Sequence, residues 1–201
     1  MHCRLGFAFL AVALATGCVA PRGTVAPPLS AQARQDALTS LSRFSFDGRA
    51  AISLGDRGTQ ASLSWAQQGG DSRLRLSGPF GAGAMRVTLE DGELSLANSR
   101  GEHLSGAAAD TALAAQLGFT PPFGALRYWL LGIAAPGEEA IEDRDAEGRL
   151  ARLTQLGWQV DYQEYRPQAS AQGQLAMPRR LRATRDDLDL RLVIDRWTIG
   201  R

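Results

Sequence analysis

Apolar side chains recur at every second residue through most of the stretch from 44 to 96, and this alternation limits the fold more than any other feature. The sets are Phe44 and Phe46; Ile52 and Leu54; Leu63 and Trp65; Leu74 and Leu76; Met85, Val87 and Leu89; and Leu94 and Leu96. Polar or small residues lie between them, which is typical of antiparallel strands with one buried face. Turn residues separate the sets, and Asp91-Gly92 is a dipeptide of two-residue hairpins. The first half therefore predicts a meander of five or six strands.

Two helices are predicted in the middle of the chain, where the apolar spacing changes between 108 and 137. Gly118 is suited to end the first of them, and Thr120 followed by Pro121 to begin the second. The second helix, with Tyr128 to Leu131 all large and apolar, should be surrounded by protein. A further short helix is expected in the run 30–44, with Ser30 as its cap.

Strand periodicity returns between Leu150 and Trp197. Between these strands, the segment 161–178 is interpreted as a strand end and a loop that Pro178 closes. Together the patterns predict an α+β fold with about ten or eleven antiparallel strands. A sheet of that length tends to curl, and the helices are expected to cover its open face.

The N-terminus has the features of a lipoprotein signal peptide over residues 1–17. Arg4 precedes an apolar run from Leu5 to Ala15, which is too short to span a bilayer. Cys18 follows small residues, as in the bacterial lipobox, where the thiol becomes lipidated. Residues 18–30, rich in proline and small residues, predict a lipidated cysteine and a flexible tether, and 31–201 a single folded domain. Val19 after the cysteine points, by resemblance to sorted lipoproteins, to the outer membrane.

Charge and catalytic residue types exclude several classes of protein. The 22 basic residues are all arginine and nearly balance 21 acids, so no basic stripe favours nucleic acid. His103 lies in a polar stretch and is interpreted as a solvated surface residue, and no His or Cys cluster could hold zinc. The acidic segment 138–145 is interpreted as a solvated hairpin face. No nucleophile, cofactor motif or phosphate loop is apparent, so an enzyme is the least favoured class.

The stretch Gly78-Pro79-Phe80-Gly81 places a large ring between turn-forming residues. Phe80 either folds back onto the core or protrudes from the surface, and the local sequence leaves both alternatives open.

Several short motifs, in order along the chain, resemble the LolB family of outer-membrane lipoproteins. They are the lipobox and tether, Gly78 to Gly81, LRYWLLG from Leu126, QLGW from Gln155, Met177-Pro178, and IDRWTI from Ile194. The chain departs from the family at Ala15, where the lipobox usually has leucine, and at Phe80, where relatives often have leucine.

The resemblance implies an unclosed antiparallel half-barrel, covered by helices, that encloses an apolar cavity. It also implies a receptor that accepts lipoprotein cargo from the periplasmic carrier LolA and inserts it into the outer membrane, as a monomer facing the periplasm and without a cofactor. The loop Pro79, Phe80 and Gly81 would serve membrane insertion. The residues expected to line the cavity are Trp65, Leu74, Leu76, Met85, Val87, Leu89, Leu94, Leu126, Trp129 and Leu130; the alternative is that they fill an ordinary core.

A second interpretation keeps the fold but not the transfer. In it the protein is an outer-membrane lipoprotein that acts as a scaffold or as a lipid-sensing binding module.

Overall fold

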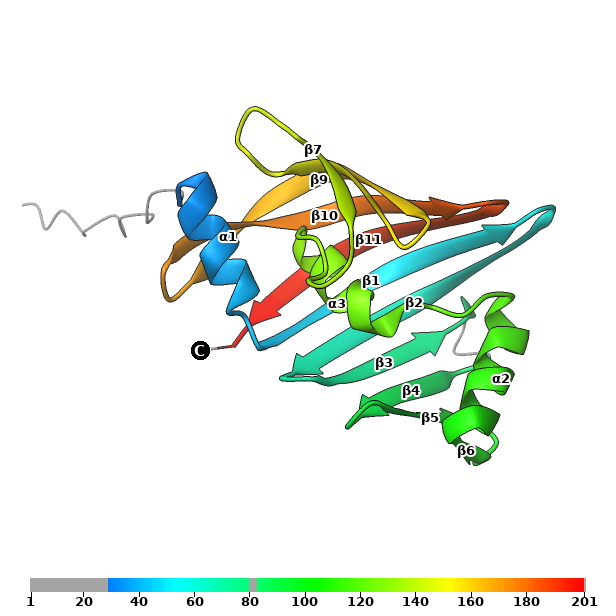
Figure 1. Cartoon of the computed structure of the whole chain (residues 1–201). Coiled ribbons are helices and arrows are strands. Elements are labelled where there is room, and N and C mark those ends of the chain that lie inside the picture. The colour runs from blue at the N-terminus through cyan, green and yellow to red at the C-terminus, as the bar shows by residue number, and fades with distance from the viewer. Residues whose placement is uncertain (1–28, 80–82, 201) are drawn as a thin grey trace, which may run out of the picture.

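One antiparallel sheet of eleven strands dominates the computed structural model, which describes residues 29–79 and 83–200 (Figure 1). The strands of the first half are β1 (Arg43–Leu54), β2 (Arg57–Gln68), β3 (Asp71–Ser77), β4 (Met85–Glu90), β5 (Glu93–Asn98) and β6 (His103–Ser105). Those of the second half are β7 (Ala140–Arg144), β8 (Leu150–Gln155), β9 (Trp158–Ser170), β10 (Gly173–Arg185) and β11 (Leu188–Ile199). The predicted α+β class and strand number are confirmed.

The strand order is β6-β5-β4-β3-β2-β1-β11-β10-β9-β8-β7, so all neighbours but one are consecutive in the chain. The exception is the pair β1 and β11, which lies in the middle of the sheet. The edges, β6 and β7, come from the middle of the chain and do not pair with each other. The sheet is therefore an unclosed half-barrel, as expected.

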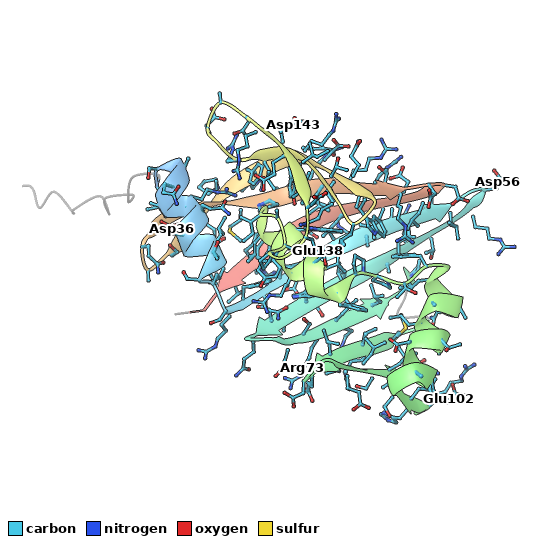
Figure 2. All side chains as sticks on the ribbon, viewed as in Figure 1. Asp36, Asp56, Arg73, Glu102, Glu138 and Asp143 are labelled. Carbon is cyan, nitrogen blue, oxygen red and sulfur yellow. The ribbon has the colours of Figure 1, made fainter. Side chains whose placement is uncertain are left out.

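The alternation of the sequence becomes an inner and an outer face. On β4, Met85 and Val87 are buried whereas Arg86 is exposed. The hairpin between β4 and β5 turns at Asp91 and Gly92, both with positive φ (51° and 81°), as the primed turn of a two-residue loop requires. Charged side chains project outward from the strands, and Arg73 of β3 is labelled in Figure 2.

Three helices accompany the sheet: α1 (Ala31–Thr39), α2 (Gly106–Leu117) and α3 (Phe123–Leu131). Ser30 caps α1 by accepting a hydrogen bond from the Ala33 amide, as expected. Gly118 ends α2 in the left-handed conformation, with φ 81°, again as expected. The start of α3 differs, because it begins at Phe123. A residue before proline is disfavoured in the helical region, so the run Thr120-Pro121-Pro122 delays the helix.

The helices occupy different places along the sheet (Figure 1). α1 lies at the end where β1 begins and β11 finishes, α2 packs on β5 and β6 at the other end, and α3 lies over the inner face. α1 is held by Arg34, which is buried and donates two hydrogen bonds to the carbonyl oxygen of Ala176 in β10, at 2.9 and 3.1 Å.

The segment 161–178 corrects the sequence interpretation, because it is not a loop. It forms most of β9 and the start of β10, which turn at residues 171–172. Proline is tolerated at Pro167 because β8 pairs only with the first four residues of β9, so this part of β9 is an edge. Pro178 lies at a shift in the β9–β10 register, where the ladder is already interrupted.

The described residues 29–79 and 83–200 contain eleven strands, three helices and two hydrophobic clusters. This segment carries a complete core and should fold without the first 28 residues. Among the described helices, none has the length and apolar character needed to cross a bilayer. Cys18 and the tether as far as residue 28 lie outside the described residues, whereas Leu29 and Ser30 are described and Ser30 caps α1.

Candidate functional site

An apolar cavity lies between the inner face of the sheet and α3. Its volume is about 100 Å³, and every one of its lining residues has an apolar side chain. The lining consists of Phe46, Ala50, Ile52, Leu63, Trp65, Leu74, Leu76, Leu117, Phe119, Pro121, Pro122, Phe123, Leu126, Trp129, Leu130, Trp158, Val160, Leu181, Ala183, Leu190 and Leu192. No lining group titrates or carries charge, so the cavity suits hydrocarbon and offers no acid–base chemistry.

The cavity has a deep part and a half-exposed rim. The deep part includes Phe46, Trp129 and Val160, each at most 3% exposed. About half of the lining is only partly buried, Leu63 and Leu126 included. Partly exposed apolar side chains gathered at the opening of a concave face are characteristic of a ligand-binding groove.

The linker between α2 and α3, residues 118–122, passes over this rim. Phe119 makes an edge-to-face contact with Trp158 of β9, with ring centroids 5.7 Å apart. Gly118 lies so close to Leu54 of β1 that a Cβ there would meet the leucine at 2.5 Å. The linker therefore bridges the two halves of the sheet across the cavity.

Six of the ten residues predicted for the cavity lie in its lining. They are Trp65, Leu74, Leu76, Leu126, Trp129 and Leu130. Their role toward acyl chains stays a prediction.

The other four predicted residues, Met85, Val87, Leu89 and Leu94, are not part of the lining. They belong to a second cluster, in which Ala109 and Leu113 of α2 cover the inner face of β4 and β5. The physical reason is that alternation identifies the face on which a side chain lies but not the helix that covers it. Here α2 fills the space that the cavity would otherwise occupy.

Gln155 of β8 holds α3 in place, a role that the sequence did not reveal. Its side-chain oxygen accepts hydrogen bonds from the Trp129 indole at 2.8 Å and from the Ala135 amide at 2.9 Å. Its side-chain nitrogen donates to the Ala135 carbonyl at 2.8 Å. The sequence offered one sign of this role. Gln155 lies two residues after Leu153, so the alternation of the strand places it on the inner face.

A second buried contact fixes the same helix. The Tyr162 hydroxyl of β9 donates to the Trp129 carbonyl at 2.8 Å. Burial raises the pKa of Tyr162 well above its usual value, so the phenol keeps its proton and remains a donor. With Gln155, it fixes the position of the Trp129 ring in the cavity wall.

Trp65 is placed by polar contacts at one edge and by rings on its faces. Its indole donates to the Gln67 side-chain oxygen at 3.2 Å, and that oxygen also accepts from Ser72 at 2.8 Å. The Trp65 ring stacks with Phe46 and Phe123, with centroids 6.5 and 6.4 Å away. The polar atom is satisfied, and the apolar surface of the indole is left for the cavity.

The predicted insertion loop is described only in part. Pro79 is exposed at the end of β3, whereas Phe80 and Gly81 lie outside the described residues. His103 is exposed on β6, and β7, which carries much of the acidic segment, is exposed throughout, as the sequence indicated. In the described part of the chain, no group of three His, Cys, Asp or Glu side chains is placed to hold a metal ion.

The family model described as "Outer membrane lipoprotein LolB" matches residues 42–197. The chain belongs to the LolB family. The outer-membrane lipoprotein LolB of Nitrosococcus oceani is 32% identical over 202 residues, covering 98% of each chain. The protein of the same name in Pseudomonas aeruginosa is 33% identical, covering 98% of this chain and 97% of its own.

The fold also resembles that of a more distant protein. A crystal structure of a DUF1329 family protein from Desulfovibrio piger superposes with a TM-score of 0.54, covering 85% of this chain and 90% of its own at 9% identity. At that identity the likeness concerns the fold alone. This member of the LolB family thus has a fold in which a curled antiparallel sheet surrounds an apolar cavity.

Proposed function

We propose that the protein is a lipid-anchored receptor that accepts lipoproteins from the periplasmic carrier LolA and inserts them into the outer membrane. In this proposal Cys18 carries the anchor, residues 18–30 are the tether, and the folded domain acts as a monomer facing the periplasm. The apolar cavity would receive the acyl chains of the cargo. The single observation that carries the proposal is that this cavity has no polar side chain and opens through a half-exposed apolar rim.

The chemistry of the cargo requires such a cavity. Each methylene kept from water contributes about 0.8 kcal/mol, so three acyl chains of about fifteen methylenes each would cost roughly 36 kcal/mol to expose. A lipoprotein therefore moves between carrier and receptor only by direct contact between their apolar surfaces.

The cavity must widen to hold this cargo. Its 100 Å³ is less than the roughly 150 Å³ of an apolar cavity that holds one benzene molecule. The linker 118–122 would be the moving part, since it crosses the rim and contacts Trp158 on one side and Leu54 on the other through apolar groups. Its displacement would join the cavity to the half-exposed rim.

The direction of transfer would come from relative affinity. The chain has no nucleotide-binding motif, so the receptor has to bind acyl chains more tightly than its donor does.

Release into the bilayer would use the loop at Pro79, Phe80 and Gly81. β3, after which Pro79 comes, ends at the opposite end of the sheet from α1 (Figure 1). The twelve residues of β1 span about 40 Å, and an extended tether of the length of residues 18–30 reaches about as far. The tether is thus long enough for that end of the sheet to face the membrane.

The test uses the chain without residues 1–18, mixed with carrier loaded with a labelled lipoprotein and no nucleotide. We expect the label to move to the receptor. Leu126→Asp, in the cavity wall, should abolish the transfer. Leu104→Asp, the matched change at an exposed position of β6, should retain it.

Failure of the wild-type domain to take up label, or equal uptake by Leu126→Asp, would overturn the proposal. Binding to another envelope protein without any transfer would favour the scaffold interpretation instead.

A further inference from the structure

Arg75 of β3 and Arg86 of β4 lie directly opposite each other on the outer face of the sheet. Both side chains are exposed. Directly opposite residues of an antiparallel pair have Cβ atoms about 5 Å apart, and like charges in such a pair are destabilising. The repulsion between these two like charges therefore destabilises this part of the sheet.

Among the described residues, no carboxylate forms an ion pair with Arg75 or Arg86. The next position across on β2 is Ser64, and across on β5 it is Ala97. Two carboxylates on the same face of the sheet have other partners. Glu90 Oε1 lies 2.8 Å from Arg73 Nη2, and Asp47 Oδ2 lies 3.9 Å from Arg196 Nη1.

Other arginines of the outer face contrast with this pair, because they have carboxylate partners. Arg49 pairs with Asp195 at 2.9 Å, and Asp189 accepts from both Arg182 and Arg191 at 2.9 Å. Arg75 and Arg86 thus differ from these arginines in having no carboxylate partner among the described residues.

Two shallow hollows flank the pair, and both are lined by Arg75 and Arg86. The one toward β5 has a volume of about 200 Å³ and also includes Ser99. The one toward β2 has a volume of about 290 Å³ and also includes Ser64, Arg73 and Asp47, whose carboxylate lies 3.9 Å from Arg196. Two guanidinium groups with hydroxyls nearby can bind a phosphate group by charge and by paired hydrogen bonds.

The position of the pair indicates where that phosphate comes from. Leu76 and Met85 form the last pairing before the β3–β4 connection, and Arg75 and Arg86 form the next. Arg75 lies two residues, or about 7 Å, before Ser77, the last residue of β3 ahead of the proposed insertion loop. An apolar segment at the boundary of a bilayer is buried about 5–10 Å deep. If the loop is buried to that depth, Arg75 and Arg86 lie at the level of the lipid phosphates.

We propose that Arg75 and Arg86 form a site for the phosphate groups of anionic phospholipids and orient the loop end of the sheet toward the membrane. The inference rests on the proposed function in one respect, namely that this end of the sheet approaches a bilayer. The site itself consists only of described residues of β3 and β4.

The test measures sedimentation of the chain lacking residues 1–18 with vesicles of phosphatidylcholine, alone or with added phosphatidylglycerol. An arginine near an anionic surface contributes about 1 kcal/mol. Arg75→Gln and Arg86→Gln should therefore each weaken binding to the anionic vesicles roughly fivefold, and the double variant by about 25-fold. Arg152→Gln on β8 removes the same charge far from the site and should change it little.

A stability measurement accompanies the binding assay. Because each substitution removes a like-charge repulsion, Arg75→Gln and Arg86→Gln should melt at the wild-type temperature or above it. A loss of vesicle binding then reflects the site and not the fold.

Three results would overturn the inference: no preference of the wild type for anionic vesicles, wild-type binding by the double variant, or an equal loss in Arg152→Gln. Loss of uptake from the carrier with vesicle binding intact would also overturn it, since the arginines would then serve an acidic protein surface. The proposed function is tested separately. If the wild type takes up no cargo but binds vesicles through these arginines, the receptor function fails and the phosphate site remains.

Discussion

Replacing Gln155 with leucine should destabilise the protein by about 3–5 kcal/mol. Leucine has a similar size, so the change removes hydrogen bonds and leaves little empty space. It strands three buried groups: the Trp129 indole N–H and the amide and carbonyl of Ala135. Each unsatisfied buried group costs about 1–3 kcal/mol, and partial relaxation lowers the sum. Because domains are stable by only about 5–15 kcal/mol, the loss is large.

Urea unfolding followed by tryptophan fluorescence measures this loss. Gln60→Leu, at an exposed position of β2, is the matched control and should cost almost nothing. Trp129→Phe removes one of the donors, so its cost and that of Gln155→Leu should not add fully in the double variant. A loss below about 1 kcal/mol in Gln155→Leu, or strict additivity, would refute the idea that this amide holds α3 against β8.

Three further predictions concern the loop, the linker and acid stability. Phe80→Glu should retain uptake of cargo from the carrier but lose release into vesicles; equal effects on both steps would contradict a role in insertion. Phe119→Ala removes an aromatic contact with Trp158 worth about 0.5–1.5 kcal/mol, so a fluorescent fatty acid should bind up to about tenfold faster in stopped-flow mixing. Hydrogen bonds from Arg182 lower the pKa of Asp189, so its stabilising contribution is present above about pH 4 and is lost as the pH falls further; Asp189→Asn should therefore flatten the acid dependence of the melting temperature.

Local chemistry made much of the fold predictable. Asp91-Gly92 forms its hairpin because both residues tolerate positive φ, and the two halves of strands follow from alternation. The segment 161–178 was mistaken because proline usually ends a strand. Pro167 escapes that rule only because β8 is short and leaves β9 with a free edge, and the length of a neighbouring strand is not visible in the local sequence.

The sequence predicted which face of the sheet lines the cavity, but not where along that face the cavity lies. Leu74 and Val87 have the same alternation, and they lie opposite each other on adjacent strands. Leu74 lines the cavity, whereas Val87 is buried beneath α2, because the helix covers the far end of the sheet. Gln155 was missed for a related reason: a polar residue on an inner face gains meaning only when its partners, Trp129 and Ala135, are known.

The pairing of β1 with β11 has a consequence for synthesis. The first and last strands made are each other's neighbours, over eleven paired positions in the centre of the sheet. A chain that stops before residue 188 therefore lacks the middle of its sheet and not an edge, and it loses Leu190 and Leu192 from the cavity wall. The two halves of the sheet pair with each other only when translation is almost complete. An unfinished chain therefore has no closed cavity for a lipid.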